Sequence, residues 1–166
     1  MKKIILLTLL VLFIQSCETK QPVVDEGPAA GYLVTADGKI DARDADPANL
    51  AIWEKYMDAH NERDYETIMT MNHDSIVLNL DDGRNIFGSD DHLVALKEYI
   101  AVGSPTWEIY FSYTMKVDGQ NGEWVIAGHR LNETIDGVES NPSIITDTFI
   151  VDGKIRRIIA FRKINN

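Results

Sequence analysis

The sequence has little of two things, cysteine and positive charge. Cys17 is the only cysteine among 166 residues, which excludes an internal disulfide. Lys and Arg together number 16 against 26 Asp and Glu, for a formal net charge of −10. Because nucleic-acid-binding proteins normally present a basic face, we expect no nucleic-acid partner. Acidity of this kind favours solubility and does not by itself mark a site.

Sequence motifs for common cofactors and nucleophiles are also missing. No pair of histidines and no cluster of carboxylates has the spacing of metal ligands, and there is no glycine-rich phosphate loop. No serine lies in the setting of a nucleophile elbow. We therefore expect neither a metal nor another cofactor.

One long apolar run is present, over Ile4–Ile14, and only Thr8 interrupts it. Lys2 and Lys3 precede it, and a short positive start followed by such a run is typical of a secretory signal. The run is about half of the ~20 residues that a helix needs to cross a bilayer, so a permanent span is the weaker interpretation. We predict a signal peptide over residues 1–16.

The end of this run resembles the bacterial lipobox, in which a cysteine follows an apolar residue and small residues. The matching residues are Ile14-Gln15-Ser16-Cys17. The resemblance implies that the chain is cut before Cys17 and that Cys17 carries lipid, which would anchor the exported protein to a membrane of the cell envelope. The alternative is a plain secretory signal followed by an incidental cysteine.

Residues 17–45 are expected to form a flexible tether, because prolines, glycines and acids recur in them without a sustained period. Tyr32–Val34 and Ile40 are apolar enough to dock on the folded part instead. The folded domain is predicted over residues 46–166.

From residue 46 onward, helical patterns come first and long alternating patterns follow. Apolar residues at spacings of three and four predict helices over 46–60, 64–69 and 89–100. A short strand pair is predicted between the last two, and period-two alternation with Asp-Gly turns then predicts four long strands. The strand ranges are 75–80, 84–87, 107–115, 124–135, 143–151 and 154–164. This order indicates an α+β fold, with three N-terminal helices packed on a curved, mainly antiparallel sheet.

Four local phrases in this order resemble the nuclear-transport-factor-2-like superfamily, in particular its SnoaL-like and ketosteroid-isomerase-like branches. They are the helix exit at 61–64, the strand phrase at 73–77, the glycine turn at 88–93 and the final hairpin at 152–155. The resemblance covers about residues 46–164. It implies a cone-shaped α+β barrel, in which helices close a curved sheet around a pocket. Enzymes, ligand binders and transport factors share this fold, so the fold does not decide the function.

Asp147 is the most informative side chain of the predicted sheet. Ile145, Phe149 and Val151 share its face of the strand, and a carboxylate on an apolar face is costly unless it is paired, hydrogen-bonded or protonated. The resemblance aligns Asp147 with the acid, and Tyr56 with the tyrosine, that bind the oxyanion in ketosteroid isomerase. Both are therefore tentative catalytic residues.

The resemblance fails at the general base, because that position falls on Asn79, whose amide cannot take a proton from carbon. Steroid isomerase activity is accordingly not expected, and His60 or Asp81 would have to replace the base in any related reaction.

The predicted pocket gathers residues from several elements. They are Trp53, Tyr56, His60, Asn79, Trp107, Arg130, Asp147 and Phe149. Each has a plainer alternative. Asp147 could be a structural ion pair with Arg130 or Arg162, and Tyr56 and His60 could simply be core residues. His92 is expected at the exposed start of a helix. Since His129 and Arg130 are neighbours on a strand, only one of them can face the pocket.

The leading functional hypothesis is an envelope lipoprotein whose pocket binds a small, mainly apolar ligand without chemistry. The first alternative is a SnoaL-like isomerase, dehydratase or cyclase that works by general acid–base catalysis. The second is a non-catalytic protein-interaction module. Aromatic residues on both faces of the predicted sheet also suggest a homodimer that pairs sheet against sheet.

Overall fold

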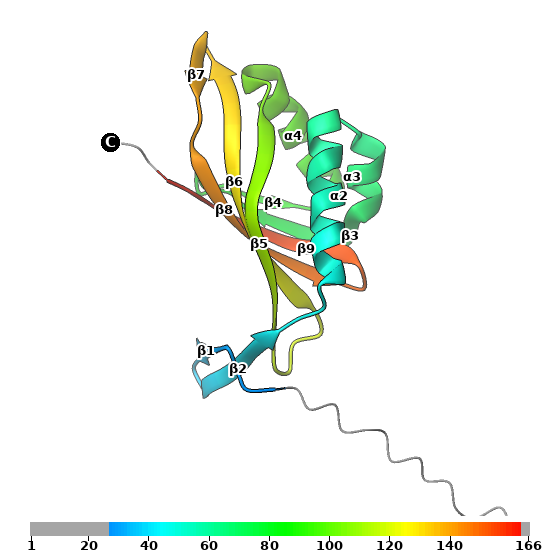
Figure 1. The fold of residues 1–166 in the computed structure, drawn as a ribbon. Helices are drawn as coiled ribbons and strands as arrows, with labels where there is room; N and C mark the ends of the chain where they lie inside the picture. The colour runs from blue at the N-terminus through cyan, green and yellow to red at the C-terminus, as the bar shows by residue number, and fades with distance from the viewer. Residues whose placement is uncertain (1–26, 164–166) are drawn as a thin grey trace, which may run out of the picture.

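The structure is a computed structural model, and it describes residues 27–163 (Figure 1). The predicted signal peptide and Cys17 lie outside these residues. Within them, no helix combines the length and apolarity that crossing a membrane requires. The helices are α2 (Ala48–Glu62), α3 (Tyr65–Met71) and α4 (Ser89–Gly103). The strands are β1 (Gly31–Thr35), β2 (Gly38–Asp44), β3 (Asn72–Asn79), β4 (Asn85–Phe87), β5 (Thr106–Val117), β6 (Glu123–Ile135), β7 (Val138–Ser140), β8 (Ser143–Val151) and β9 (Lys154–Arg162).

Aspartate carboxylates accept backbone hydrogen bonds at the starts of two helices. Asp64 caps α3, because its carboxylate accepts a hydrogen bond of 3.0 Å from the backbone N–H of Thr67. Ahead of α2, the Asp46 carboxylate accepts from the N–H of Ala48 at 2.9 Å. The third helix, α4, begins at Ser89, the first residue of its predicted range, and its N-cap is Gly88 at a φ of 86°, a conformation that glycine adopts without strain.

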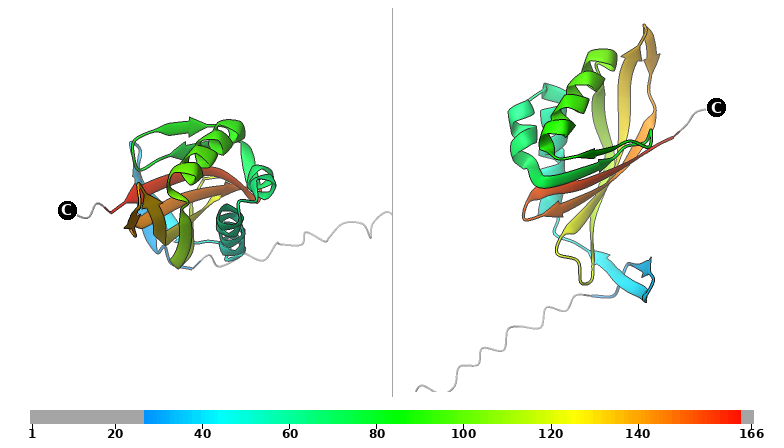
Figure 2. Two further views of the ribbon diagram at one scale, coloured as in Figure 1. Left: turned by 90° about the horizontal axis from the view of Figure 1, so that it is seen from above. Right: turned by 180° about the vertical axis from the view of Figure 1, so that it is seen from behind.

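The sheet has the strand order β1-β2-β5-β6-β8-β9-β3-β4, with β7 paired to β6. Neighbouring strands run antiparallel except for β3 and β9, which run parallel. Register shifts interrupt the ladder between β5 and β6 and between β8 and β9, and such irregularities bend a strand. The three helices lie on one side of the curved sheet (Figure 2). The predicted α+β class, with helices on a curved and mostly antiparallel sheet, is confirmed.

The hairpin of β1 and β2 corrects the predicted tether. Residues 31–44 are not a free linker, because β2 pairs with the far end of β5 and extends the sheet. The hairpin lies beyond the helical layer (Figure 1). Ala42 is buried there, whereas Tyr32 and Val34 remain exposed. The alternative describes this segment better: it docks on the domain, and the backbone hydrogen bonds between β2 and β5 hold it there.

The long strands have an inner face under the helices and an outer face away from them. On β8, Ile144, Thr146 and Thr148 are buried on the inner face. Between them, Ile145 and Asp147 point the other way. Inner-face residues of β6 and β9 pack with Trp53, Tyr56 and Met57 of α2 to form the core.

Candidate functional site: a pocket between helices and sheet

A pocket of about 470 Å³ lies between α2, α4 and the inner face of the sheet. This volume is in the range of small-molecule sites. Most of its lining is apolar, and two hydrogen-bonded groups contain several of its polar side chains. The lining residues are Trp53, Tyr56, Met57, His60, Leu78, Leu80, Asp81, Asp82, Arg84, Ile86, His92, Ala95, Leu96, Tyr99, Trp107, His129, Leu131, Ile144, Thr146, Ile158, Ala160 and Arg162.

Four of the predicted pocket residues line this cavity. Trp53, Tyr56 and His60 follow one another at helical spacing on α2, and Trp107 is the second residue of β5. The Trp107 ring lies 5.9 Å from the His60 ring, centroid to centroid. The apolar period of α2 predicted this face because α2 must pack against the sheet along a single stripe.

The other four predicted pocket residues do not line the cavity. Asn79 bonds instead to Asn85 and Arg157, and Arg130 is exposed and pairs with Glu108 at 3.5 Å. The Phe149 ring packs at a tilt against the Trp124 ring, with the ring centroids 4.8 Å apart. These side chains alternate with inner-face neighbours on their strands, so they belong to the outer face.

Asp147 also lies on the outer face, which corrects its expected position. The ladder places it in one row with Tyr113, Ile126 and Ile159, and it is partly buried. Partial burial raises its pKa above the usual range. Neither Arg130 nor Arg162 pairs with it among the described residues, since they bind Glu108 and Asp81. The sequence argument grouped Asp147 correctly with Ile145 and Phe149, but that apolar face is the outside of the sheet.

The first polar group of the pocket, which we call the inner network, consists of Tyr56, Asn72, Ser89, His60 and His92. The Tyr56 hydroxyl donates to Asn72 Oδ1 at 2.7 Å. Asn72 Nδ2 lies 2.8 Å from Ser89 Oγ and 3.1 Å from His92 Nδ1. Since full burial raises the pKa of Tyr56 well above its usual value, this hydroxyl stays protonated and is committed to Asn72.

The histidines of the pocket are held uncharged. The pKa of His60 is lowered to about 4, chiefly by burial; the hydrogen bond to the Tyr56 carbonyl offsets part of this effect, and the charge of Arg63 adds a smaller lowering. Burial also lowers the pKa of His92 to about 3, with a smaller contribution from His60, and that of His129 to about 4. All three rings are therefore neutral imidazoles at pH 7.

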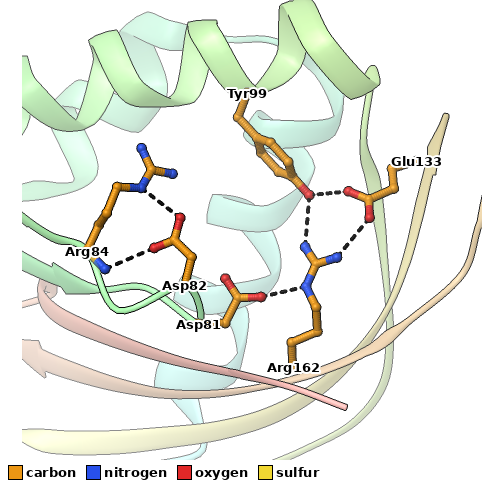
Figure 3. A network of polar contacts seen from close by, with 6 residues as sticks. All are labelled: Asp81, Asp82, Arg84, Tyr99, Glu133 and Arg162. Carbon is orange, nitrogen blue, oxygen red and sulfur yellow. Dashed lines mark hydrogen bonds and ion pairs between the residues drawn. The ribbon is translucent and has the colours of Figure 1, made fainter. Parts of the chain in front are cut away.

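The second polar group, which we call the rim network, consists of Asp81, Tyr99, Glu133 and Arg162 (Figure 3). The Arg162 guanidinium binds the Asp81 carboxylate at 2.5 Å and the Glu133 carboxylate at 2.8 Å. Tyr99 donates its hydroxyl hydrogen to the other oxygen of Glu133 at 2.5 Å. The Glu133 side chain is 2% exposed, against 23% for Asp81 and 32% for Arg162. Each acid of this network thus has a charged or hydrogen-bonding partner.

Several of these residues were not predicted as pocket residues. His92 was expected to be exposed, yet it is buried and lies at helical spacing from Leu96 and Tyr99 on the inner side of α4. That spacing was the available signal. His129 proved to be the inward member of the His129–Arg130 pair. Glu133 could not have been foreseen, because its partners come from 29 and 34 positions away.

The arrangement supplies hydrogen bonds and little free charge. Asp81 is bound to Arg162 and Asp82 to Arg84, so each acid that lines the pocket has a cationic partner. Among residues 27–163, no three His, Cys, Asp or Glu side chains come together as metal ligands would. A ligand in this pocket would therefore contact mainly apolar side chains and, along one side, neutral imidazole rings.

Neither family models nor curated proteins match the chain. Solved structures do match its fold. A proposed ketosteroid isomerase from Kribbella flavida is 20% identical, covers 70% of this chain and 78% of its own, and has a TM-score of 0.56. A proposed SnoaL-like polyketide cyclase from Shewanella denitrificans is 12% identical, covers 71% of this chain and 92% of its own, and has a TM-score of 0.57. An LEH-like epoxide hydrolase from M. tuberculosis is 15% identical, covers 68% of this chain and 80% of its own, and has a TM-score of 0.57.

At such low identity these likenesses show the fold alone. They confirm the predicted fold, with helices on a curved and mostly antiparallel sheet, which the chain shares with these solved structures.

Proposed function

We propose that this protein is an exported, lipid-anchored envelope protein whose domain binds a small, mainly apolar molecule. The observation that carries the proposal is the pocket of about 470 Å³ between the helices and the inner face of the sheet. A core that only holds a fold together is packed to high density. An open volume of this size, walled mainly by apolar side chains, matches the usual form of a ligand site.

The anchor in the proposal comes from the sequence. Ile14-Gln15-Ser16-Cys17 resembles a lipobox behind a short positive and apolar leader, and a lipid on Cys17 would keep the domain at a membrane surface. Globomycin, which inhibits the signal peptidase for lipoproteins, should then make the full-length precursor accumulate. Processing that is insensitive to the inhibitor, or unaffected by Cys17→Ala, would remove the anchor from the proposal.

Binding can be measured with the chain from residue 17 onward, carrying Cys17→Ser so that no lipid interferes. Trp53 and Trp107 both line the pocket, so an apolar ligand should change the intrinsic fluorescence. Ala160→Trp should fill the cavity from β9 and abolish binding, while the exposed Ala51→Trp on α2 should leave it intact. Absence of binding across a broad set of neutral apolar probes, or equal binding to both variants, would contradict the proposal.

A second candidate is acid–base catalysis on such a ligand, since His60 and Asp81, the two replacement bases suggested by the sequence, both line the pocket. Against it, burial lowers the pKa of His60 to about 4, and Asp81 is bound by Arg162. Neither is a strong free base at neutral pH. A bound ligand recovered chemically unchanged after long incubation supports binding, whereas a product that disappears in His60→Leu supports catalysis.

We also propose a homodimer that pairs the outer faces of two sheets. The ladder brings Phe111, Gly128, Ile145 and Phe161 into one row across β5, β6, β8 and β9. Phe111, Ile145 and Phe161 are exposed, as is Tyr113 in the next row, and a contiguous apolar patch of this kind favours association. Sedimentation should show a dimer that Tyr113→Glu dissociates. Val94→Glu, at an equally exposed position on α4, should not affect it.

A further inference from the structure

We propose that His60 and His92 form a paired acceptor and donor that recognises a neutral hydroxyl group on the ligand. This inference rests on the proposed binding function and names the ligand class, an apolar alcohol. It depends on which nitrogen of each ring carries the hydrogen, and the surrounding hydrogen bonds decide that point.

His60 presents an acceptor to the pocket. Its Nδ1 lies 2.7 Å from the backbone carbonyl oxygen of Tyr56. A carbonyl oxygen can only accept, so Nδ1 carries the hydrogen and donates it. Because the buried ring is neutral, Nε2 then holds a lone pair and no hydrogen. No hydrogen bond involves Nε2 among the described residues, so this lone pair remains for a ligand.

His92 presents a donor, because Asn72 fixes its opposite tautomer. The fully buried Tyr56 hydroxyl must donate, and Asn72 Oδ1 is the acceptor at 2.7 Å. The amide nitrogen of Asn72 therefore points toward Ser89 and His92. The other arrangement of the amide would leave the Tyr56 hydrogen without a partner in a buried position.

An amide nitrogen can only donate, so His92 Nδ1 accepts from it. Ser89 is consistent with this direction, since its hydroxyl donates to Met69 Sδ and its oxygen accepts from Asn72. The hydrogen of the neutral His92 ring must then lie on Nε2. Nε2 of His92 likewise has no partner among the described residues.

The two rings stack on one another in the pocket wall. Their centroids are 5.8 Å apart with an interplanar angle of 29°, and both rings line the cavity. No hydrogen bond joins them among the described residues, so the acceptor on His60 and the donor on His92 stay free together. An alcohol satisfies both, because its hydrogen goes to His60 and its oxygen accepts from His92.

Other functional groups satisfy this pair less well. A ketone can only accept and leaves His60 without a donor, while an ammonium can only donate and leaves His92 without an acceptor. A carboxylate would enter a wall whose imidazoles are neutral, and the Arg162 guanidinium is already bound by Asp81 and Glu133. A buried group left unpaired weakens binding by roughly 5- to 100-fold.

The tautomers can be tested directly in the chain from residue 17 with Cys17→Ser. Nitrogen-15 NMR of labelled histidine separates the two neutral tautomers by their ring shifts. We expect His60 with hydrogen on Nδ1 and His92 with hydrogen on Nε2 at pH 7. The same tautomer in both rings, or a charged ring, would overturn the proposal without any variant being made.

Ligand selectivity provides the second test, with 2-adamantanol, 2-adamantanone, 1-adamantanecarboxylate and 1-adamantanamine as matched probes. The alcohol should bind at least about 10-fold more tightly than the ketone, carboxylate or amine. His60→Leu and His92→Leu should each reduce that preference to less than about 3-fold. His73→Leu, at a histidine outside the pocket, should keep it.

The outcomes separate the two proposals. If all four probes bind equally well, the hydroxyl inference fails and the proposed pocket function stands. If none binds and the fluorescence of Trp53 and Trp107 does not change, both fail. Loss of the alcohol preference in His73→Leu would also contradict the inference, because that residue does not line the pocket.

Discussion

The inner network and the rim network lie on either side of Trp107 and handle polar groups in opposite ways. Trp107 is 5.9 Å from His60 on one side and 6.2 Å from Tyr99 on the other. On the His60 side, Tyr56, His60 and His92 are buried and every group of the network is uncharged. On the Tyr99 side, Asp81 and Arg162 keep partial access to water, and Arg162 is held in ion pairs with Asp81 and Glu133.

Solvent access explains this difference. Transfer of a lone charge into a dry interior costs several kcal/mol, so a buried group becomes neutral unless a partner of opposite charge stays with it. The histidines are neutral, so each ring offers one N–H donor and one nitrogen acceptor at defined positions. Arg162 keeps its charge because two carboxylates hold it, and these raise its pKa even though burial alone would lower it. Directional neutral groups can select a ligand, whereas paired ions mainly hold elements together.

The largest expected effect is the response of the inner side of the pocket to acid. The pKa values of His60, His92 and His129 are lowered in the folded protein to about 4, 3 and 4. The unfolded chain therefore takes up protons first as the pH falls below about 6.5. Their contribution to stability is present above pH 6.5 and is lost toward pH 4, by about 2 kcal/mol for each ring at pH 5.

Urea unfolding between pH 7 and pH 5 measures this loss. In His92→Gln, the slope of the unfolding free energy against pH should fall by about one proton, or ~1.4 kcal/mol per pH unit. An unchanged slope would mean that His92 is not buried and neutral.

The next effect is at the rim, where Arg162→Met should lower the free energy of unfolding by about 2–3 kcal/mol. Glu133 would remain enclosed with only Tyr99 as a partner, and a buried charge that loses its counter-ion is strongly destabilising. Arg84→Met is the matched control. Its ion pair with Asp82 is exposed and should contribute less than about 0.5 kcal/mol. Equal effects of the two substitutions would show that the rim network is no more than a surface pair.

Tyr56→Phe should have a smaller effect, about 1–2 kcal/mol, because Asn72 Oδ1 loses its donor in a buried position. It should also free the Asn72 amide to turn over, so that the tautomer of His92 is no longer fixed. Tyr65→Phe, whose ring contacts the ammonium of Lys97 at 4.8 Å, should change stability by less than about 0.5 kcal/mol. If Tyr56→Phe keeps a single, unchanged His92 tautomer, Tyr56 and Asn72 do not fix that tautomer, and the inner network does not determine ligand recognition.

The smallest effect is expected at Asp147, which belongs to neither network. Asp147→Asn should leave ligand affinity within about 2-fold of the starting protein and stability within about 0.5 kcal/mol. Its neighbour Thr146 points inward and lies 3.1 Å from His129 Nε2, so Thr146→Val should cost about 1 kcal/mol. If isothermal titration and urea unfolding show a larger effect for Asp147→Asn than for Thr146→Val, the Asp147 side chain faces the pocket and its placement on the outer face is wrong.

Much of the fold could be predicted because its signals are local. The stripe on α2, the Asp64 cap and the Asp152-Gly153 turn each depend on residues within one or two turns of chain. The strand ranges of β8 and β6 were close for the same reason. The hairpin of β1 and β2 was missed because it is stabilised by pairing with β5, about seventy residues away in sequence.

The pocket was half predicted. Trp53, Tyr56, His60 and Trp107 lie on faces that periodicity defines without ambiguity, and they do line it. Asn79, Arg130, Asp147 and Phe149 lie on strands with apolar residues on both faces, where alternation separates two sets but does not say which set is inside. The choice depends on which side the helices cover.

By itself, the sequence determined the succession of helices and strands, the alternation along each strand and the excess of negative charge, because these follow from neighbouring residues and from composition. Only the tertiary structure decided which strand face encloses the pocket, which histidines lose their charge and which acids find Arg162. Those outcomes depend on burial and on contacts between residues as far apart as Asp81 and Arg162. Solvent exclusion is a property of the assembled fold, and no local pattern contains it.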